Sequence, residues 1–248
     1  MAQTGADPLV SFSTRATMLE VDAVGNIYLA EDYRLTKYAP DGSELAFYED
    51  FVHGPIGQVD ASDPMKLLIY FSDQQHVVVL DRTMSVISSF NLLDLGFVNV
   101  TAIGNSMDDR FWIFDQSDFM LRKIDQNGTV FKETQVLNVL LDGAVTVTRI
   151  LEREGRIYAH DPDRGVLVFG LFGTYEETLP IDGEGIHYIQ GRLAWTDGDQ
   201  MALLDPETPG AQRLDLPTAD GRDRLAARVA KQRLVVLFDG RLRVHPVP

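Results

Sequence analysis

Short runs of hydrophobic residues recur along the chain at spacings of 36 to 45 residues, and an aspartate closely follows each run. The aspartates are Asp32, Asp73, Asp118, Asp161, Asp197 and Asp239. Each run is continuously apolar, which is typical of a strand that is covered on both faces. A second apolar run follows each aspartate and predicts the next strand. The pattern therefore predicts one all-β structural unit repeated six times.

Turn residues separate the second apolar run of a repeat from a more polar segment. Pro40-Asp41-Gly42 and Asn127-Gly128 are examples, and their Gly and Asn residues supply the positive φ that such turns require. The segments after them, such as Glu44 to Tyr48 and Thr129 to Thr134, predict a fourth strand that faces solvent. Four antiparallel strands in about 40–45 residues match a β-propeller blade.

The two ends of the chain together complete the sixth repeat. This repeat stops after a third strand near Arg241 to Pro246, while residues 9–13 precede the first repeat and have no other assignment. Pairing the two would close the ring and remove an exposed sheet edge. We therefore predict one all-β domain over residues 1–248, a six-bladed β-propeller with four antiparallel strands per blade, closed by the N-terminal strand. The predicted blades are 16–50, 56–95, 99–137, 145–181, 185–217, and 224–248 with 9–13.

The early repeats resemble those of a known superfamily. Residues 24–32, Val-Gly-Asn-Ile-Tyr-Leu-Ala-Glu-Asp, with Leu35 to Gly42 after them, are similar to the repeat of NHL-type propellers, and Ile124 to Gly128 has the same ending. The resemblance is best in residues 21–130. It implies the six-bladed superfamily of TolB-like, NHL and gluconolactonase-like proteins. Because that superfamily contains enzymes, sugar binders and protein-interaction modules, the resemblance implies a fold and leaves the function open.

Charge and composition narrow the range of partners. The formal net charge is −15 and is spread along the chain, which argues against a nucleic-acid partner and against binding to an anionic membrane surface. No apolar run approaches the ~20 residues that span a bilayer, so we expect no membrane insertion. The chain contains no cysteine, so neither disulfide nor thiolate chemistry is available to it.

The first five residues bear on localisation. Met1-Ala2-Gln3-Thr4-Gly5 is a short polar segment that runs directly into a strand-like segment. One interpretation is that a signal peptide has been removed before Gln3, and on it we expect an exported, periplasmic protein of the bacterial envelope. An ordinary cytoplasmic start is the alternative.

The sequence lacks the motifs of familiar enzymes. It contains no G-x-S-x-G motif, no phosphate-binding loop and no G-x-G-x-x-G after a strand. Its five histidines lie far apart and do not have the close spacing of metal ligands. We therefore predict no catalytic residue and no bound cofactor.

Acidic residues recur between the second and third strands of a repeat. The pairs are Glu31 and Asp32, Asp115 and Asp118, Asp161 and Asp163, and Asp197 and Asp199. Carboxylates gathered on one face could hold Ca²⁺. A residue that occurs once per blade more often accepts backbone N–H groups in its own turn, and we favour that structural interpretation. Asp197-Gly198-Asp199 is the strongest candidate for an exception.

The resemblance to gluconolactonase-like proteins implies an alternative function, a metal-dependent lactonase-type hydrolase. Those proteins hold a divalent metal on Glu, Asn and Asp residues, and the resemblance implies Glu20, Asn105 and Asp197 as candidate ligands here. A carbohydrate-binding propeller is the second alternative. Such a protein should expose aromatic side chains, whereas Trp112 and Trp195 lie in strands predicted to be buried.

The segments that join one blade to the next contain more Leu and Phe than a solvent-facing strand should. Residues 92–98 and 136–142 show this most clearly, and Phe51 to Pro55 is a shorter version. These side chains either pack under the next blade or form an exposed patch for a partner. The candidate partner-binding residues in these segments are Leu93, Leu95, Phe97, Leu140 and Leu141, and Phe119, just past its aspartate turn, adds to the same face. We accordingly predict a non-enzymatic interaction or scaffold propeller whose partner is another protein.

Overall fold

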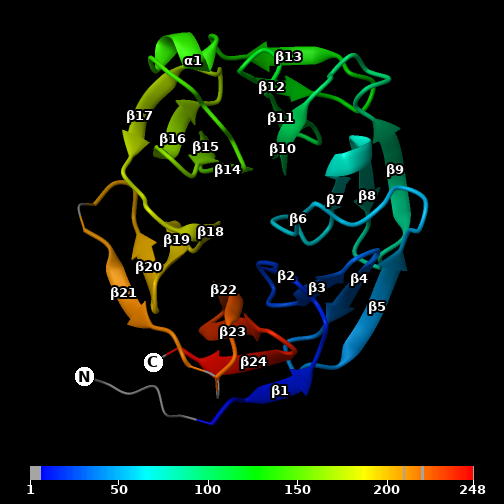
Figure 1. The fold of residues 1–248 in the computed structure, drawn as a ribbon, viewed down its shortest axis with the longest axis vertical. Coiled ribbons are helices and arrows are strands. Elements are labelled where there is room, and N and C mark those ends of the chain that lie inside the picture. The colour runs from blue at the N-terminus through cyan, green and yellow to red at the C-terminus, as the bar shows by residue number, and fades with distance from the viewer. Residues whose placement is uncertain (1–6, 209, 219–220, 248) are drawn as a thin grey trace. The chain divides into compact units, whose positions relative to one another are not determined.

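The computed structural model describes residues 7–208, 210–218 and 221–247, and most of the regular structure in these residues is β-strand. The strands form six four-stranded antiparallel sheets (Figure 1). Five sheets keep chain order, from β2-β3-β4-β5 to β18-β19-β20-β21, and the sixth has the order β1-β24-β23-β22. The fold is therefore a six-bladed β-propeller, as the repeat predicts. The N-terminal residues 1–6, on which the localisation prediction depends, lie outside the described residues.

Contacts between residues divide the chain into two compact units. Unit 1 takes the described parts of Met1–Val52, Ala61–Pro64 and Gly183–Pro248, and unit 2 takes His53–Asp60 and Met65–Asp182. The strands of unit 1 are β1 Val10–Ser13, β2 Met18–Val21, β3 Ile27–Glu31, β4 Arg34–Tyr38, β5 Glu44–Glu49, β18 Glu184–Ile189, β19 Arg192–Asp197, β20 Gln200–Leu204, β21 Gln212–Asp215, β22 Arg224–Ala230, β23 Arg233–Phe238 and β24 Arg241–Pro246. The strands of unit 2 are β6 Gln58–Asp60, β7 Leu67–Phe71, β8 His76–Leu80, β9 Val86–Asn91, β10 Val100–Asn105, β11 Phe111–Asp115, β12 Met120–Ile124, β13 Val130–Glu133, β14 Arg149–Arg153, β15 Arg156–Asp161, β16 Gly165–Gly170 and β17 Tyr175–Leu179.

In unit 1 the N-terminal strand completes the last blade. β1 pairs antiparallel with β24, from Val10 opposite Val244 to Ser13 opposite Arg241 (Figure 1). Phe12 of β1 also stacks on Tyr38 of β4, with ring centroids 5.0 Å apart. The strand therefore satisfies the free edge of β24 and contacts the first blade, which confirms the predicted completion of the sixth blade.

In unit 2, hydrophobic clusters fill the space between successive blades. One cluster joins the β6–β9 blade to the β10–β13 blade, and a second joins the β10–β13 blade to the β14–β17 blade. Glutamine side chains add hydrogen bonds between the same blades. Gln58 bonds both the N–H and the C=O of Ile103, and Gln75 bonds both backbone groups of Val100. Strands of different blades do not pair through their backbones. The side-chain amides therefore bond backbone groups that have no strand partner on that side.

An aspartate organises the turn between the third and fourth strands in four of the blades. Asp81 accepts the N–H groups of Thr83 and Ser85, and Asp125 accepts those of Asn127 and Thr129. The hydrogen bond from the Thr83 hydroxyl helps to hold the pKa of Asp81 below its ordinary value. The four aspartates are Asp41, Asp81, Asp125 and Asp205.

Helical structure in the described residues is limited to the single turns η1 Ser72–Gln74 and α1 Leu137–Leu140. Neither approaches the length that a membrane-crossing helix needs. Trp112 and Trp195 are buried, as their strands predict. α1 lies in a joining segment, where the sequence predicts no helix.

Candidate functional site

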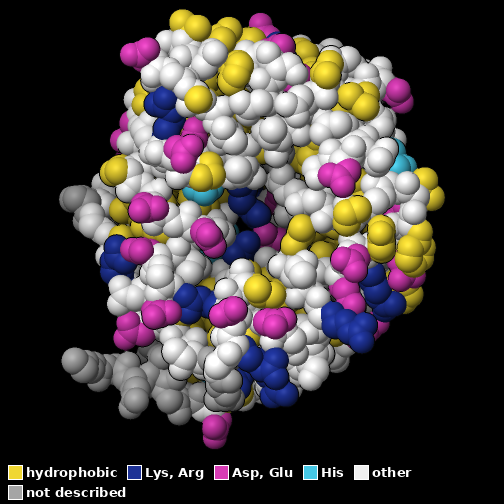
Figure 2. Space-filling model, in the orientation of Figure 1, with side chains coloured by type: hydrophobic (Ala, Val, Ile, Leu, Met, Phe, Trp, Pro, Cys, Tyr) yellow, Lys and Arg dark blue, Asp and Glu magenta, His cyan; other side chains and the backbone are white. Residues whose placement is uncertain are grey.

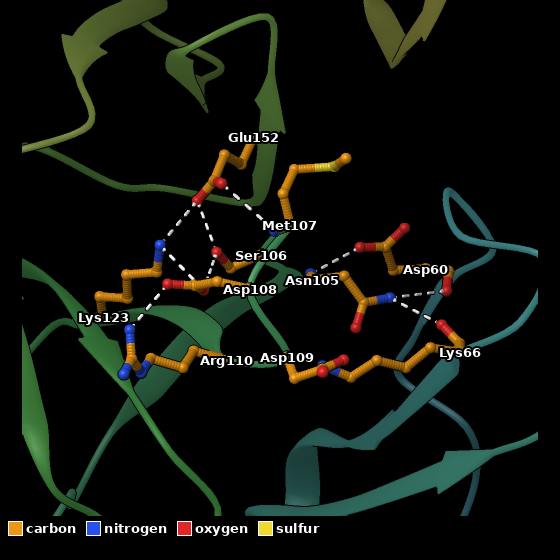
Figure 3. A network of polar contacts seen from close by, with 10 residues as sticks. All are labelled: Asp60, Lys66, Asn105, Ser106, Met107, Asp108, Asp109, Arg110, Lys123 and Glu152. Atoms are coloured by element: carbon orange, nitrogen blue, oxygen red, sulfur yellow. Dashed lines mark hydrogen bonds and ion pairs between the residues drawn. The ribbon is translucent and has the colours of Figure 1, made fainter.

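Buried polar side chains gather at the ends of the first strands of the blades in unit 2. Asp60 ends β6, Asn105 ends β10 and Glu152 lies near the end of β14, and all three are less than 5% exposed. Together with Ser106, Asp108 and Lys123 they form the inner-strand polar cluster, which Figure 3 shows from close by. A buried charge is stable only where partners compensate for the lost hydration, so the partners decide what the cluster can do.

Glu152 is bonded on both of its carboxylate oxygens. Ser106 Oγ donates to Oε2 at 2.7 Å, Trp112 Nε1 donates to the same oxygen, and the N–H of Met107 donates to Oε1 at 3.2 Å. Lys123 Nζ lies 3.4 Å from Oε2. All the donors come from the β10–β13 blade, so Glu152 ties β14 to the neighbouring blade.

Lys123 also neutralises the carboxylate of Asp108, which lies in the turn between β10 and β11. Lys123 Nζ lies 3.0 Å from Asp108 Oδ1, and Arg110 donates to Asp108 Oδ2 at 2.7 Å (Figure 3). Partial burial opposes ionisation of Asp108, but hydrogen bonds from Ser106 and Lys123 outweigh it and hold the pKa of Asp108 below its ordinary value. Two carboxylates therefore face two basic groups, and the local charge is balanced.

Asn105 joins the first two blades of unit 2. Its N–H donates to Asp60 Oδ2 at 2.8 Å, and its Nδ2 donates to the carbonyl of Lys66 at 3.0 Å (Figure 3). Asn105 Oδ1 is buried and has no hydrogen-bond partner among the described residues. The other polar groups of this side chain and of Glu152 are used to hold blades together, so the geometry supports a structural role for the cluster.

Unit 1 has a corresponding buried ion pair between β2 and β22. Arg228 donates to Glu20 through Nε at 3.2 Å and through Nη2 at 2.9 Å, and both side chains are less than a tenth exposed. Gly185 lies against the guanidinium, because a Cβ there would approach Arg228 Nη1 to 2.6 Å. His187 Nε2 accepts the N–H of Val229 at 3.2 Å. These contacts link the blades of β2, β18 and β22.

The candidate metal ligands do not fit a metal site. Glu20 is held by Arg228, and Asp197 is paired with Arg213 at 2.5 Å. Asp199 lies 3.4 Å from Arg224 Nη2, and the side-chain amide of Asn105 donates to the carbonyl of Lys66. In the part of the chain that the structure describes, no three or more His, Cys, Asp or Glu residues are grouped as a metal site would require. No step of a metal-dependent reaction can be derived from these residues.

Two of the four acidic pairs between the second and third strands have the turn role that we favour. Asp115 accepts the N–H of Ser117 at 2.9 Å, and Asp161 accepts the N–H of Asp163 at 2.9 Å. Asp161 also accepts the N–H of Thr146 in the preceding joining segment. These carboxylates therefore stabilise their own turns.

The partner-binding candidates, five in the joining segments and Phe119 in the turn between β11 and β12, divide into two groups. Phe97 is buried in the core between two blades, which corrects its assignment as a surface residue: its ring fills the space under the next blade. Leu95, Leu141 and Phe119 are partly buried and pack against the same cores. The exposed candidates are Leu93 and Leu140.

Three further exposed aliphatic side chains lie in the same joining segments and are absent from the predicted set. Val98 is 66% exposed, Val139 is 77% exposed and Val136 is 39% exposed. Sequence reasoning favoured the larger Leu and Phe residues, but in these segments larger side chains such as Phe97 and Leu137 anchor the chain to the core. The exposure of Val136 and Val139 depends on the single turn of α1, and that of Val98 depends on the loop between β9 and β10, neither of which the sequence pattern predicts.

No protein-family model matches the chain, and no curated protein matches it. Solved structures do match. The WD40 domain of Pan2 from Neurospora crassa has 12% identity and a TM-score of 0.62, over 98% of this chain and 95% of that one. A chain of the mitotic checkpoint complex has 11% identity and a TM-score of 0.65, over 97% and 94%. Streptogramin B lyase has 13% identity and a TM-score of 0.59, over 96% and 86%.

At these identities the likeness establishes the fold alone. The similar structures include WD40 domains and a lyase, so they do not select a function. The resemblance to NHL-type and TolB-like repeats stays a prediction. The chain is a six-bladed β-propeller.

Proposed function

We propose that this chain is a non-enzymatic protein-binding propeller, and that in unit 2 the partner binds at the joining segments. The observation that carries the proposal is a set of exposed aliphatic side chains in two consecutive segments, here called the joining-segment surface. Its members are Leu93, Val98, Val136, Val139 and Leu140. Figure 2 shows hydrophobic side chains at the top of the view, where Figure 1 places α1. Exposed apolar groups that form one continuous patch are typical of binding sites.

The exposed side chains are not needed to hold the segments in place. Leu92 and Leu137 are fully buried, and Phe97 is 6% exposed, so each segment already has core anchors. Exposed aliphatic groups do not stabilise a monomer by burial, whereas each contributes when a partner removes it from water. The arrangement therefore fits a preformed interface.

One turn brings the two segments together. The turn between β11 and β12 receives a hydrogen bond from α1, because the N–H of Leu137 donates to the carbonyl of Phe119 at 2.8 Å. The same turn bonds the other segment, since the N–H of Gln116 donates to the carbonyl of Asn99 at 2.9 Å. Both segments are thus hydrogen-bonded to one hairpin, and a partner would meet a preorganised surface.

Protein binding agrees with the use of propellers in assemblies, since one similar structure is a chain of the mitotic checkpoint complex. Streptogramin B lyase is named for an enzyme, so the fold does not decide between the classes. The proposal rests instead on the joining-segment surface and on the neutralised, structural character of the inner-strand polar cluster. A place in the bacterial envelope is part of the proposal, and fractionation of cells of the natural source, with detection of the protein by an antibody, tests it.

A photoreactive residue in place of Val139 tests the proposed surface directly. Irradiation in cells of the natural source should crosslink one specific protein, which mass spectrometry identifies. Val98→Glu should lower the yield of that crosslink at least about tenfold. Binding of the partner would bury the new carboxylate, and the cost of that burial would offset the energy of a strong interface contact. The melting temperature should stay unchanged, since Val98 is 66% exposed.

Phe172→Glu is the matched control. Phe172 is 75% exposed in the turn between β16 and β17, which lies at the opposite end of the strands from the joining segments. This change should leave the crosslink intact. A crosslink of equal yield in the Val98→Glu variant, or no specific crosslink at all, would contradict the proposal.

A further inference from the structure

A projecting apolar tip follows the outer strand of the first blade in unit 1. We define the β5 tip as Tyr33, Phe51 and Val52. Phe51 is 72% exposed and Val52 is 82% exposed, and the rings of Tyr33 and Phe51 lie 5.7 Å apart. In Figure 2 hydrophobic side chains gather over the end of β5 and the loop after it. The tip belongs to unit 1, whereas the joining-segment surface belongs to unit 2.

Hydrogen bonds hold the tip in its projecting form. The N–H of Asp50 donates to the carbonyl of Tyr33 at 3.0 Å. The carboxylate of Asp50 accepts the Tyr48 hydroxyl at 2.8 Å and the N–H of Val52 at 2.7 Å. Because the backbone is already ordered, a partner that covers Phe51 and Val52 loses little affinity to ordering.

Carboxylates surround the tip. Glu31 and Asp32 lie at the turn that carries Tyr33, Glu49 ends β5, and all three are exposed. The nearby guanidinium of Arg34 does not balance them, because it lies 3.8 Å from the centroid of the Phe47 ring and contacts Glu44 at 3.4 Å. The tip is therefore apolar at its centre and acidic at its rim.

We propose that the β5 tip binds a basic peptide segment of a partner protein, one in which an apolar anchor is flanked by Lys or Arg. Charge complementarity selects this occupant: the apolar anchor covers Phe51 and Val52 while the basic groups face Glu31, Asp32 and Glu49. A second copy of the chain would bring the same carboxylates and a net charge of −15, and an anionic membrane would be repelled.

Phage-displayed random peptides panned on the whole protein test this inference. Clones that bind an unrelated acidic protein are removed by counter-selection, and the Phe51→Ser, Val52→Ser double variant is kept for the binding test. The enriched peptides should carry Lys or Arg beside a Leu, Phe or Trp. A synthetic peptide of the consensus should bind the double variant at least about tenfold more weakly than the wild type.

Salt and charge variants separate the two parts of the site. Raising the ionic strength from about 0.01 M to about 1 M should weaken the consensus peptide, because screening shortens the Debye length from about 30 to about 3 Å. Glu31→Gln with Glu49→Gln should weaken binding and flatten this salt dependence, whereas Phe172→Ser should change neither. Enrichment of no peptide, enrichment of peptides without basic residues, or equal binding to the double variant overturns the proposal, as does self-association through the tip.

Discussion

At the scale of single residues, the buried polar groups in unit 2 act as ties between blades. Glu152 takes donors from Ser106, Met107 and Trp112, about 40 or more residues away in the chain. Removing one partner from such a group leaves the other unsatisfied in a poorly hydrated place, which costs about 1–3 kcal/mol and more when a charge is involved. These residues therefore contribute to stability and to the spacing of blades.

Asp108 gives the cluster a predictable response to pH. Its pKa is lowered in the folded protein, so its stabilising contribution is present above the unfolded pKa and is lost as the pH falls through the folded value. Asp108→Asn should unfold at lower urea concentration than the wild type at neutral pH, and the difference should shrink below about pH 4, where aspartate protonates. Urea unfolding at several pH values measures this.

The adjacent Asp109 is the control for this prediction. Its side chain is 99% exposed and its contact with Lys66 is long, at 3.9 Å. Asp109→Asn should therefore change stability little at any pH. A difference between wild type and Asp108→Asn that does not vary with pH would show that Asp108 acts through packing and not through its charge.

Residue types in the sequence predicted which side chains are buried better than they predicted which side chains interact with one another. The continuous apolar runs marked the buried strands, and Trp112 and Trp195 are buried as expected. The partner of Glu20 could not be read in the same way, because Arg228 lies 208 residues further along the chain. A carboxylate that is paired and one that binds a metal look alike until the fold brings its neighbours together.

At the scale of elements, periodicity was informative because each blade repeats the same burial pattern. The predicted first blade, 16–50, contains β2 to β5 over Met18–Glu49, and the predicted third blade, 99–137, contains β10 to β13 over Val100–Glu133. The same reasoning did not predict the structure of the joining segments. α1 is a single turn, which is too short to show helical periodicity, and its exposure depends on which residues face the next blade.

The N-terminal strand should be essential to the sixth blade. Deletion of residues 1–13 removes all four residue pairs with β24, exposes the edge of that strand, and takes Phe12 from the ring of Tyr38. We expect a loss of several kcal/mol, a large share of the ~5–15 kcal/mol of a typical domain. Thermal and urea unfolding measure it, with deletion of residues 1–6 as the matched control because that change leaves β1 in place. A truncated protein as stable as the control would contradict this role.

At the scale of the whole molecule, the fold depends on contacts between blades that are distant in sequence. Each blade is a sheet whose faces need neighbours, so hydrophobic clusters and buried polar pairs recur where blades meet. The sequence predicted the number of blades from local signals, but the ties between them are non-local. The joining-segment surface and the β5 tip stay exposed after this packing, and they are the surfaces that we propose for partners.

Mutation of the buried ion pair between Glu20 and Arg228 tests how much such a contact between blades contributes to the stability of the protein. Each single change, Glu20→Met or Arg228→Met, leaves an uncompensated buried charge and should cost about 3–5 kcal/mol. The double variant should cost less than the sum of the two, because it leaves no unpaired charge, and urea unfolding of the four proteins gives the coupling energy. The same cycle on the exposed pair Arg34 and Glu44 should give less than about 1 kcal/mol. Additive costs for Glu20 and Arg228 would mean that the two side chains stabilise their blades separately, through packing, and that their ion pair does not join β2 to β22.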